Sequence, residues 1–112
     1  MTKLTSRRSS PRKGPALSRA AVAKLLKEVP KWKADAASQS IQRTFKFKDY
    51  YGTMAFVNAV AWIAHTEDHH PDLTVGYNKV GIAFSTHSVG GLSENDFISA
   101  AKIDALNPPG PR

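Results

Sequence analysis

The sequence predicts an α+β domain, with a four-stranded antiparallel sheet that carries three helices on one face. Apolar residues recur at helical spacing in some segments and alternate with polar residues in others. The segments follow in the order helix, strand, strand, helix, strand, strand, helix. Because short turns join the strands of each pair, we expect the sheet to be antiparallel.

The predicted domain spans residues 18–107, and capping residues mark the start of each helix. Ser18 suits the N-cap of a first helix that extends to about residue 28. Asp49 can cap a long second helix to about residue 68, which Pro71 keeps from continuing. Ser93 can cap the third helix, and Asp96 completes a capping-box pattern. The prolines at 108, 109 and 111 should stop that helix, so 108–112 form a Pro-rich end.

Four strands are expected between the helices. The first is a short segment at 31–33 with Trp32 pointing inward, and the second is an alternating segment at 39–48. Leu73, Val75 and Tyr77 alternate in a third strand. The fourth has Val80, Ile82 and Phe84 on one face, and Ala83, Ser85 and His87 on the other.

Composition excludes several classes of protein. The 112 residues fit one small domain, and a domain of this size would gain stability from oligomerisation. The absence of cysteine excludes disulfides and thiolate catalysis. No apolar run approaches the roughly 20 residues of a membrane span, and no signal-like apolar segment opens the chain. We therefore expect a cytoplasmic protein that does not enter a membrane.

The positive charge is concentrated at the N-terminus. The formal net charge is +7, and residues 1–19 contain basic side chains but no acid. Residues 1–17 are also poor in large apolar groups, which predicts a disordered basic tail. Such a tail could be a solvated extension, an arm that contacts nucleic acid or an organellar presequence, although Pro11 and Pro15 argue against an amphipathic helix. Any contact with nucleic acid would involve this tail alone.

All four histidines lie in one stretch: His65, His69, His70 and His87. Histidine titrates near neutral pH, so a cluster of histidines suggests proton transfer or a metal site. His65 and His69 are spaced to share a helix face, but the zinc-protease pattern requires Glu where Thr66 stands. A purely structural role is also open, because a helix C-terminus favours positive charge.

Two other kinds of site are weakly supported. Ser85, His87 and Asp96 could form a hydrolase triad, but the nucleophile-elbow pattern GxSxG is absent. The Gly90-Gly91 pair alone is a weak indication of a phosphate-binding loop.

Several motifs resemble those of the pterin-4a-carbinolamine dehydratases. They are DHHP at 68–71, YNKV at 77–80, STHS at 85–88, and GLS at 91–93 followed by Asp96. The resemblance covers about residues 18–106 and leaves out the basic tail. It implies an α+β fold that assembles as a homodimer or homotetramer. It also implies dehydration of a 4a-hydroxytetrahydropterin to the quinonoid dihydropterin, which recycles the pterin of aromatic amino acid hydroxylases, without metal or cofactor.

The resemblance also assigns residues to roles. Its catalytic histidines correspond to His69, His70 and His87. Substrate contacts fall on Asp68, Ser85, Thr86 and Ser88, and the supporting residues are Asp96, Trp32 and His65. His65 stands where many members carry an acid.

The residue types suit this chemistry. Loss of water requires a proton for the departing hydroxyl and removal of one from ring nitrogen N5, and imidazoles can do both near neutral pH. We expect His70 to be the general acid, with His69 and His87 positioning the pterin and sharing the role of base. Asp96 would orient a histidine or cap its helix. A dehydratase-like binding module that assists transcription or Rubisco assembly is the alternative.

Overall fold

The computed structural model describes residues 3–106 and confirms the predicted order of the main elements. In chain order these are η1 (Leu4–Ser6), α1 (Arg19–Leu26), β1 (Lys33–Ala34), β2 (Ile41–Lys46), α2 (Tyr50–Glu67), β3 (Asp72–Val75), β4 (Lys79–Phe84), η2 (His87–Val89) and α3 (Glu94–Asp104). The Pro-rich end at 108–112 lies outside the described residues.

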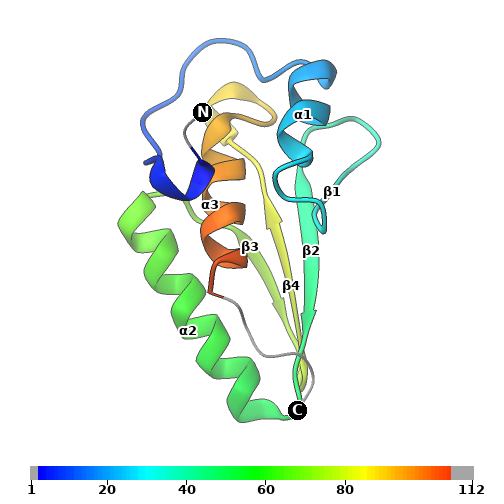
Figure 1. Ribbon diagram of the computed structural model, residues 1–112, viewed down its shortest axis with the longest axis vertical. Coiled ribbons are helices and arrows are strands. Elements are labelled where there is room, and N and C mark those ends of the chain that lie inside the picture. Colours follow the sequence, from blue (N-terminus) through cyan, green and yellow to red (C-terminus); the bar gives the residue numbers. More distant parts are fainter. Residues whose placement is uncertain (1–2, 107–112) are drawn as a thin grey trace.

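The sheet has four antiparallel strands in the order β1-β2-β4-β3, and the helices cover one of its faces (Figure 1). This confirms the predicted fold class. Phe45 pairs with Val80 across β2 and β4, and Ile41 pairs with Phe84. All four of these side chains are buried beneath the helices, because alternate residues of a strand point to the same face.

The caps predicted from the sequence are present. The Ser18 side chain accepts a hydrogen bond from the backbone N–H of Ala21 at 3.1 Å. Asp49 accepts one from the backbone N–H of Gly52 at 2.9 Å. Ser93 and Asp96 form the predicted capping box at the start of α3. Because each cap satisfies backbone donors that a helix leaves free, the helix starts are fixed locally by sequence.

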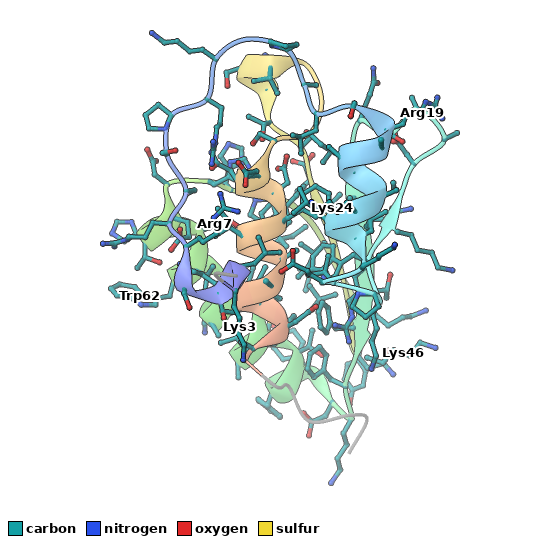
Figure 2. The ribbon with its side chains drawn as sticks, turned by 45° about the horizontal axis from the view of Figure 1, so that its top comes forward. Lys3, Arg7, Arg19, Lys24, Lys46 and Trp62 are labelled. Carbon is teal, nitrogen blue, oxygen red and sulfur yellow. The ribbon has the colours of Figure 1, made fainter. Side chains whose placement is uncertain are left out.

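The buried face of α2 differs from the simplest prediction. The spacing of apolar residues suggests that Tyr50 begins the inward face, but its side chain is exposed. Phe56 and Val60, which the spacing also puts on the inward face, are buried as expected, and Thr53 and Glu67 are buried with them. No residue from 50 to 66 is charged, so the pattern does not select one face of the helix. Tyr51 and Trp62 remain 81% and 66% exposed, and Trp62 projects outward from α2 (Figure 2). None of the helices within residues 3–106 is long and apolar enough to cross a membrane.

Four predicted positions lie elsewhere than expected. β1 begins at Lys33, one residue after the buried Trp32. Tyr77 follows β3 in an exposed turn, and His87 opens the 3-10 helix η2 rather than extending β4. Leu106, which helical spacing puts on the apolar side of α3, lies beyond the end of that helix and is 38% exposed.

The N-terminal arm, defined as residues 3–17, lies against the domain, whereas its composition predicts disorder. Leu4 in η1 is only 3% exposed and belongs to the hydrophobic core, and η1 lies beside α3 (Figure 1). Arg7 forms an ion pair with Glu94, and the backbone N–H of Leu17 bonds to the carbonyl of Leu92 at 2.8 Å. The composition does not show these contacts because each one depends on partners far along the chain.

Replacing Leu4 with alanine distinguishes the two descriptions of the arm. Leu→Ala in a core costs about 2–5 kcal/mol, and we expect the lower end of this range because a terminal segment can detach by itself. Urea unfolding should show this loss of stability for Leu4→Ala. Thr5→Ala, at the exposed neighbouring position, should leave the free energy of unfolding unchanged. Equal stability of the Leu4 variant and the wild type would mean that the arm is disordered, as its composition predicts.

Candidate active site

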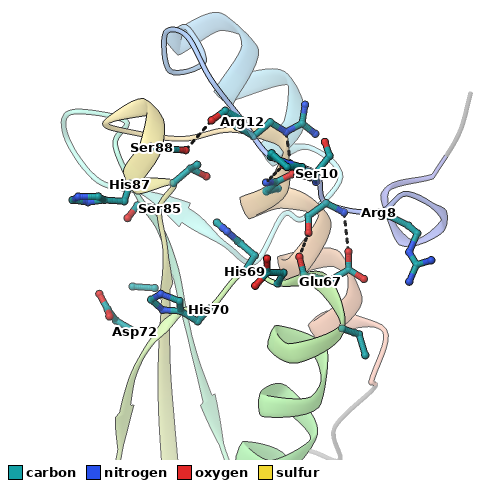
Figure 3. Close-up of a pocket in the computed structure, with 17 residues that line it drawn as sticks. Arg8, Ser10, Arg12, Glu67, His69, His70, Asp72, Ser85, His87 and Ser88 are labelled. Carbon is teal, nitrogen blue, oxygen red and sulfur yellow. Dashed lines mark hydrogen bonds between the residues drawn. The ribbon is translucent and has the colours of Figure 1, made fainter.

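A single open cavity gathers most of the residues that the sequence singled out. It has a volume of about 940 Å³ and lies where the end of α2, the segment after β4 and the N-terminal arm meet (Figure 3). This volume is near the upper end of the range for small-molecule sites, about 300–1,000 Å³. The predicted residues that line it are Asp68, His69, His70, Ser85, Thr86, His87 and Ser88.

The end of α2 places two successive histidines at this cavity. Asp68 adopts the left-handed conformation, with φ 50° and ψ 45°, and its N–H bonds to the carbonyls of Ala64 and His65. The N–H of His69 also bonds to the carbonyl of Ala64, at 3.1 Å. A left-handed residue at this position ends a helix and redirects the chain. His69 and His70 therefore leave the helix in different directions (Figure 3).

His69 is held by a buried carboxylate. Its Nε2 lies 2.6 Å from Oδ1 of Asp96, which is fully buried, and the His69 side chain is 12% exposed. If Nε2 donates to the carboxylate, Nδ1 is left to accept a proton, since neutral imidazole has one donor and one acceptor. The contact thus selects both the ring orientation and the tautomer of His69.

Asp96 is itself fixed from the other side. Its Oδ2 accepts hydrogen bonds from the backbone N–H of Ser93 at 2.9 Å and from the Thr86 hydroxyl at 2.8 Å. Thr86 and Ser93 also share a hydrogen bond of 2.6 Å between their hydroxyls. Asp96 therefore caps α3 and contacts His69 at once, which unites the two roles that the sequence left open. Thr86, expected to contact substrate, uses its hydroxyl within this network.

A second support for His69 comes from the core. Its ring is stacked on Phe84, with centroids 5.6 Å apart and planes 8° from parallel. Phe84 in turn contacts Trp32, at 5.8 Å between centroids, and the indole N–H of Trp32 donates to Asp104 at 2.9 Å. Trp32 does not line the cavity, so it supports the site only through Phe84.

His70 and His87 are candidates that are less constrained by their surroundings. Both are exposed, both line the cavity, and neither ring has a hydrogen-bond partner among residues 3–106. Ser85 is likewise exposed, whereas the Ser88 hydroxyl donates to the backbone carbonyl of Arg12 at 2.9 Å. The site therefore combines one fixed imidazole with two that are free to meet a ligand.

His65 lies outside the cavity. It is exposed on α2, where its ring lies 5.6 Å from that of Trp62. It therefore does not join the other three histidines around the cavity. Across the part of the chain that the structure describes, no group of three or more His, Asp or Glu residues could hold a metal ion.

The sequence did not indicate that the arm or Glu67 belongs to this site. Residues 8–12 line the cavity, and the Glu67 side chain is only 4% exposed. Glu67 accepts from Lys102 at 2.6 Å and from the backbone N–H of Ser9 at 2.8 Å, and the Ser9 hydroxyl donates to the Glu67 carbonyl. A glutamate at the end of a helix gives no sign of such a partner, because Ser9 is far away in sequence.

These contacts influence the titration of Glu67. Burial raises the pKa of this carboxyl. The hydrogen bonds from Lys102 and Ser9, together with the charge of Lys102, lower the pKa by more than burial raises it, so it lies below its usual value. The interaction therefore stabilises the fold at pH values above the ordinary pKa of a glutamate. It is lost as the pH falls through the lowered value.

The family model described as "Pterin 4 alpha carbinolamine dehydratase" matches residues 15–106. A protein of Stenotrophomonas maltophilia (strain K279a) is 59% identical over 105 residues, which cover 92% of this chain and 90% of that protein. A protein of Xanthomonas campestris pv. campestris (strain 8004) is 60% identical over 98 residues, covering 86% and 83%. Both carry the name "putative pterin-4-alpha-carbinolamine dehydratase".

Two solved structures share the fold. One is a transcriptional coactivator/pterin dehydratase of Brucella melitensis, with a TM-score of 0.77 and 32% identity over 81% of this chain and 97% of that chain. The other is a pterin dehydratase-like protein identified as a RuBisCO assembly factor in the α-carboxysome. Its TM-score is 0.59, with 26% identity over 68% of this chain and 88% of that chain.

Proposed function

The chain belongs to the pterin-4a-carbinolamine dehydratase family, and we propose that it dehydrates a 4a-hydroxytetrahydropterin to the quinonoid dihydropterin and water. Such a reaction recycles the pterin of aromatic amino acid hydroxylases. The observation that carries the proposal is the convergence of His69, His70 and His87 on one cavity, with His69 held by the buried Asp96.

The proposed reaction requires one proton to be delivered and one to be removed. His70, in its protonated form, gives a proton to the hydroxyl at C4a, and the C4a–O bond breaks with release of water. The lone pair of N5 forms the new C4a=N5 bond as the N5 proton leaves to a base. His69 and His87 share the base and positioning roles, and His69 is the better prepared because Asp96 fixes its ring. The proton delivered to the hydroxyl and the proton removed from N5 balance, so the proposed reaction requires no metal or further cofactor.

The proposal places the substrate between the histidines and the polar groups beside them. Asp68 and Ser85 offer side chains at the cavity wall, and η2 offers the Ser88 segment. The proposal places the reaction in the cytoplasm, a reducing compartment that suits a chain without cysteine.

We also propose that the chain acts as a homodimer or homotetramer. The exposed face of α2 carries Tyr51 and Trp62, and the edge strand β3 exposes Leu73 and Val75. Exposed apolar side chains and an unpaired strand edge both favour association. We place any contact with nucleic acid on the basic arm.

A binding module with little catalysis is the second candidate. It is supported by the two solved relatives, whose titles name a coactivator and a RuBisCO assembly factor. A direct assay separates the candidates: stopped-flow decay of chemically generated 4a-hydroxytetrahydropterin, with and without the protein, after prolonged treatment with EDTA. The dehydratase proposal expects acceleration that EDTA does not remove, whereas the binding module expects the uncatalysed rate.

A further inference from the structure

The N-terminal arm is built into the cavity wall by several specific contacts. Asn95, a buried residue of α3, holds Ser10 through a reciprocal pair of hydrogen bonds. In these, Ser10 N–H donates to Asn95 Oδ1 at 3.1 Å, and Asn95 Nδ2 donates to the Ser10 carbonyl at 2.7 Å. Arg12 Nε also donates to Asn95 Oδ1, at 3.0 Å. Together with the Ser9–Glu67 contacts, these bonds fix residues 8–12 on both sides of Ser10.

The cavity has walls of opposite charge. Asp72 lies on the side of His70 (Figure 3), and none of the ion pairs within residues 3–106 involves its carboxylate. The opposite wall is the arm, which contributes the hydroxyl of Ser10 and the guanidinium of Arg12. One end of this guanidinium, Nη1, also lies 3.7 Å from Oε1 of Glu94. Figure 3 shows Asp72 and His70 on one side of the cavity, with Ser10 and Arg12 on the other. One wall therefore accepts hydrogen bonds and the other donates them.

A pterin has the same polarity along its length. Its 2-amino group and N3–H are adjacent donors that suit a carboxylate. Position C6 is bonded to N5 and carries the substituent of the ring. If His69, His70 and His87 act at C4a and N5, the substituent leaves the ring beside the histidines. It then points away from the aminopyrimidine end and away from Asp72.

We propose that residues 8–12 form a specificity wall that binds an oxygen-bearing substituent at C6 of the pterin. This rests on the proposed function, since the direction of the ring follows from the catalytic histidines. Ser10 and Arg12 supply N–H and O–H donors for hydroxyl oxygens, and Asn95 is a positioning residue that holds them. The cavity has room for such a chain, because its volume of about 940 Å³ is large for a bicyclic ring alone.

The test compares two substrates that differ only at C6. These are the 4a-hydroxy derivatives of 6-methyltetrahydropterin and of 6-(1,2-dihydroxypropyl)tetrahydropterin. The quantity measured is the ratio of their kcat/KM values, which does not depend on the fraction of folded enzyme. In the full chain, Arg12→Ala should lower the preference for the dihydroxypropyl substrate by about tenfold or more, the effect of losing a hydrogen bond to a charged group. Most of the loss should lie in KM.

Lys13→Ala is the matched control, because it removes the neighbouring positive charge from a residue that does not line the cavity. Its ratio should equal that of the wild type. An unchanged ratio for Arg12→Ala, or an equal loss on both substrates, would overturn the specificity wall and leave the dehydratase proposal intact. If the wild type accelerates neither substrate, the proposed function fails. Calorimetric binding of the corresponding stable 7,8-dihydropterins then decides whether Arg12 distinguishes the substituents.

Discussion

The His70→Ala variant is expected to dehydrate the 4a-hydroxytetrahydropterin about 10²–10⁴-fold more slowly than the wild type. This corresponds to an activation barrier that is roughly 3–5 kcal/mol higher. His70 lines the cavity, is exposed and has no side-chain partner within residues 3–106, so its removal should cost the reaction its acid without disturbing the fold. Stopped-flow decay of the substrate measures the rate, and circular dichroism checks the fold.

His65→Ala is the matched control for this variant. His65 is also an exposed histidine near the end of α2, but it lies outside the cavity against Trp62. Its replacement should leave the rate close to that of the wild type. Equal rates for the His70 variant and the wild type would remove His70 from the role of acid. A double His70→Ala, His87→Ala variant should cost less than the sum of the single effects, because the two residues act on one transition state.

The second large effect is expected for Asp96→Ala. The change removes the partner of His69 and leaves the N–H of Ser93 and the hydroxyl of Thr86 without their acceptor. Loss of a buried hydrogen-bond partner costs about 1–3 kcal/mol for each group left unsatisfied. Partners that orient metal-bound histidines typically contribute about 10–100-fold to activity, and we expect an effect of similar size on His69. Urea unfolding and the dehydration rate should therefore both change.

Asp49→Ala separates these two consequences. Asp49 is likewise an acidic residue that caps a helix, through the backbone N–H of Gly52, but it has no contact with the cavity. It should lose about 0.5–2 kcal/mol of stability without a change in kcat. If Asp96→Ala behaves in the same way, with stability lowered and kcat unchanged, the contact with His69 has only a structural role.

Local signals were sufficient for much of this fold. The N-caps at Ser18, Asp49 and Ser93 act on backbone groups a few residues away, so the sequence alone could place the helix starts. The inward face of α2 could be placed only in part. The spacing includes Phe56 and Val60, which are buried, but also Tyr50, which is exposed, because apolar residues lie on several sides of this helix.

The sequence was sufficient to predict the histidines of the site but not the part of the cavity wall that the arm forms. His69, His70 and His87 could be named from their motifs, and Asp96 from its capping position. The arm could not be assigned to the cavity, because its contacts are polar and their partners are far apart in the sequence. The bonds of Ser9 to Glu67 and of Ser10 to Asn95 leave no periodic pattern that composition or spacing could reveal.

The rate of 4a-hydroxytetrahydropterin decay at increasing concentrations of the full-length protein tests the central claim most directly. If the protein is a dehydratase, the observed rate constant rises in proportion to wild-type concentration, and the same concentrations of the His70→Ala variant stay close to the uncatalysed value. A rate constant that does not change with wild-type concentration would contradict the catalytic role and leave the binding module as the function of this fold.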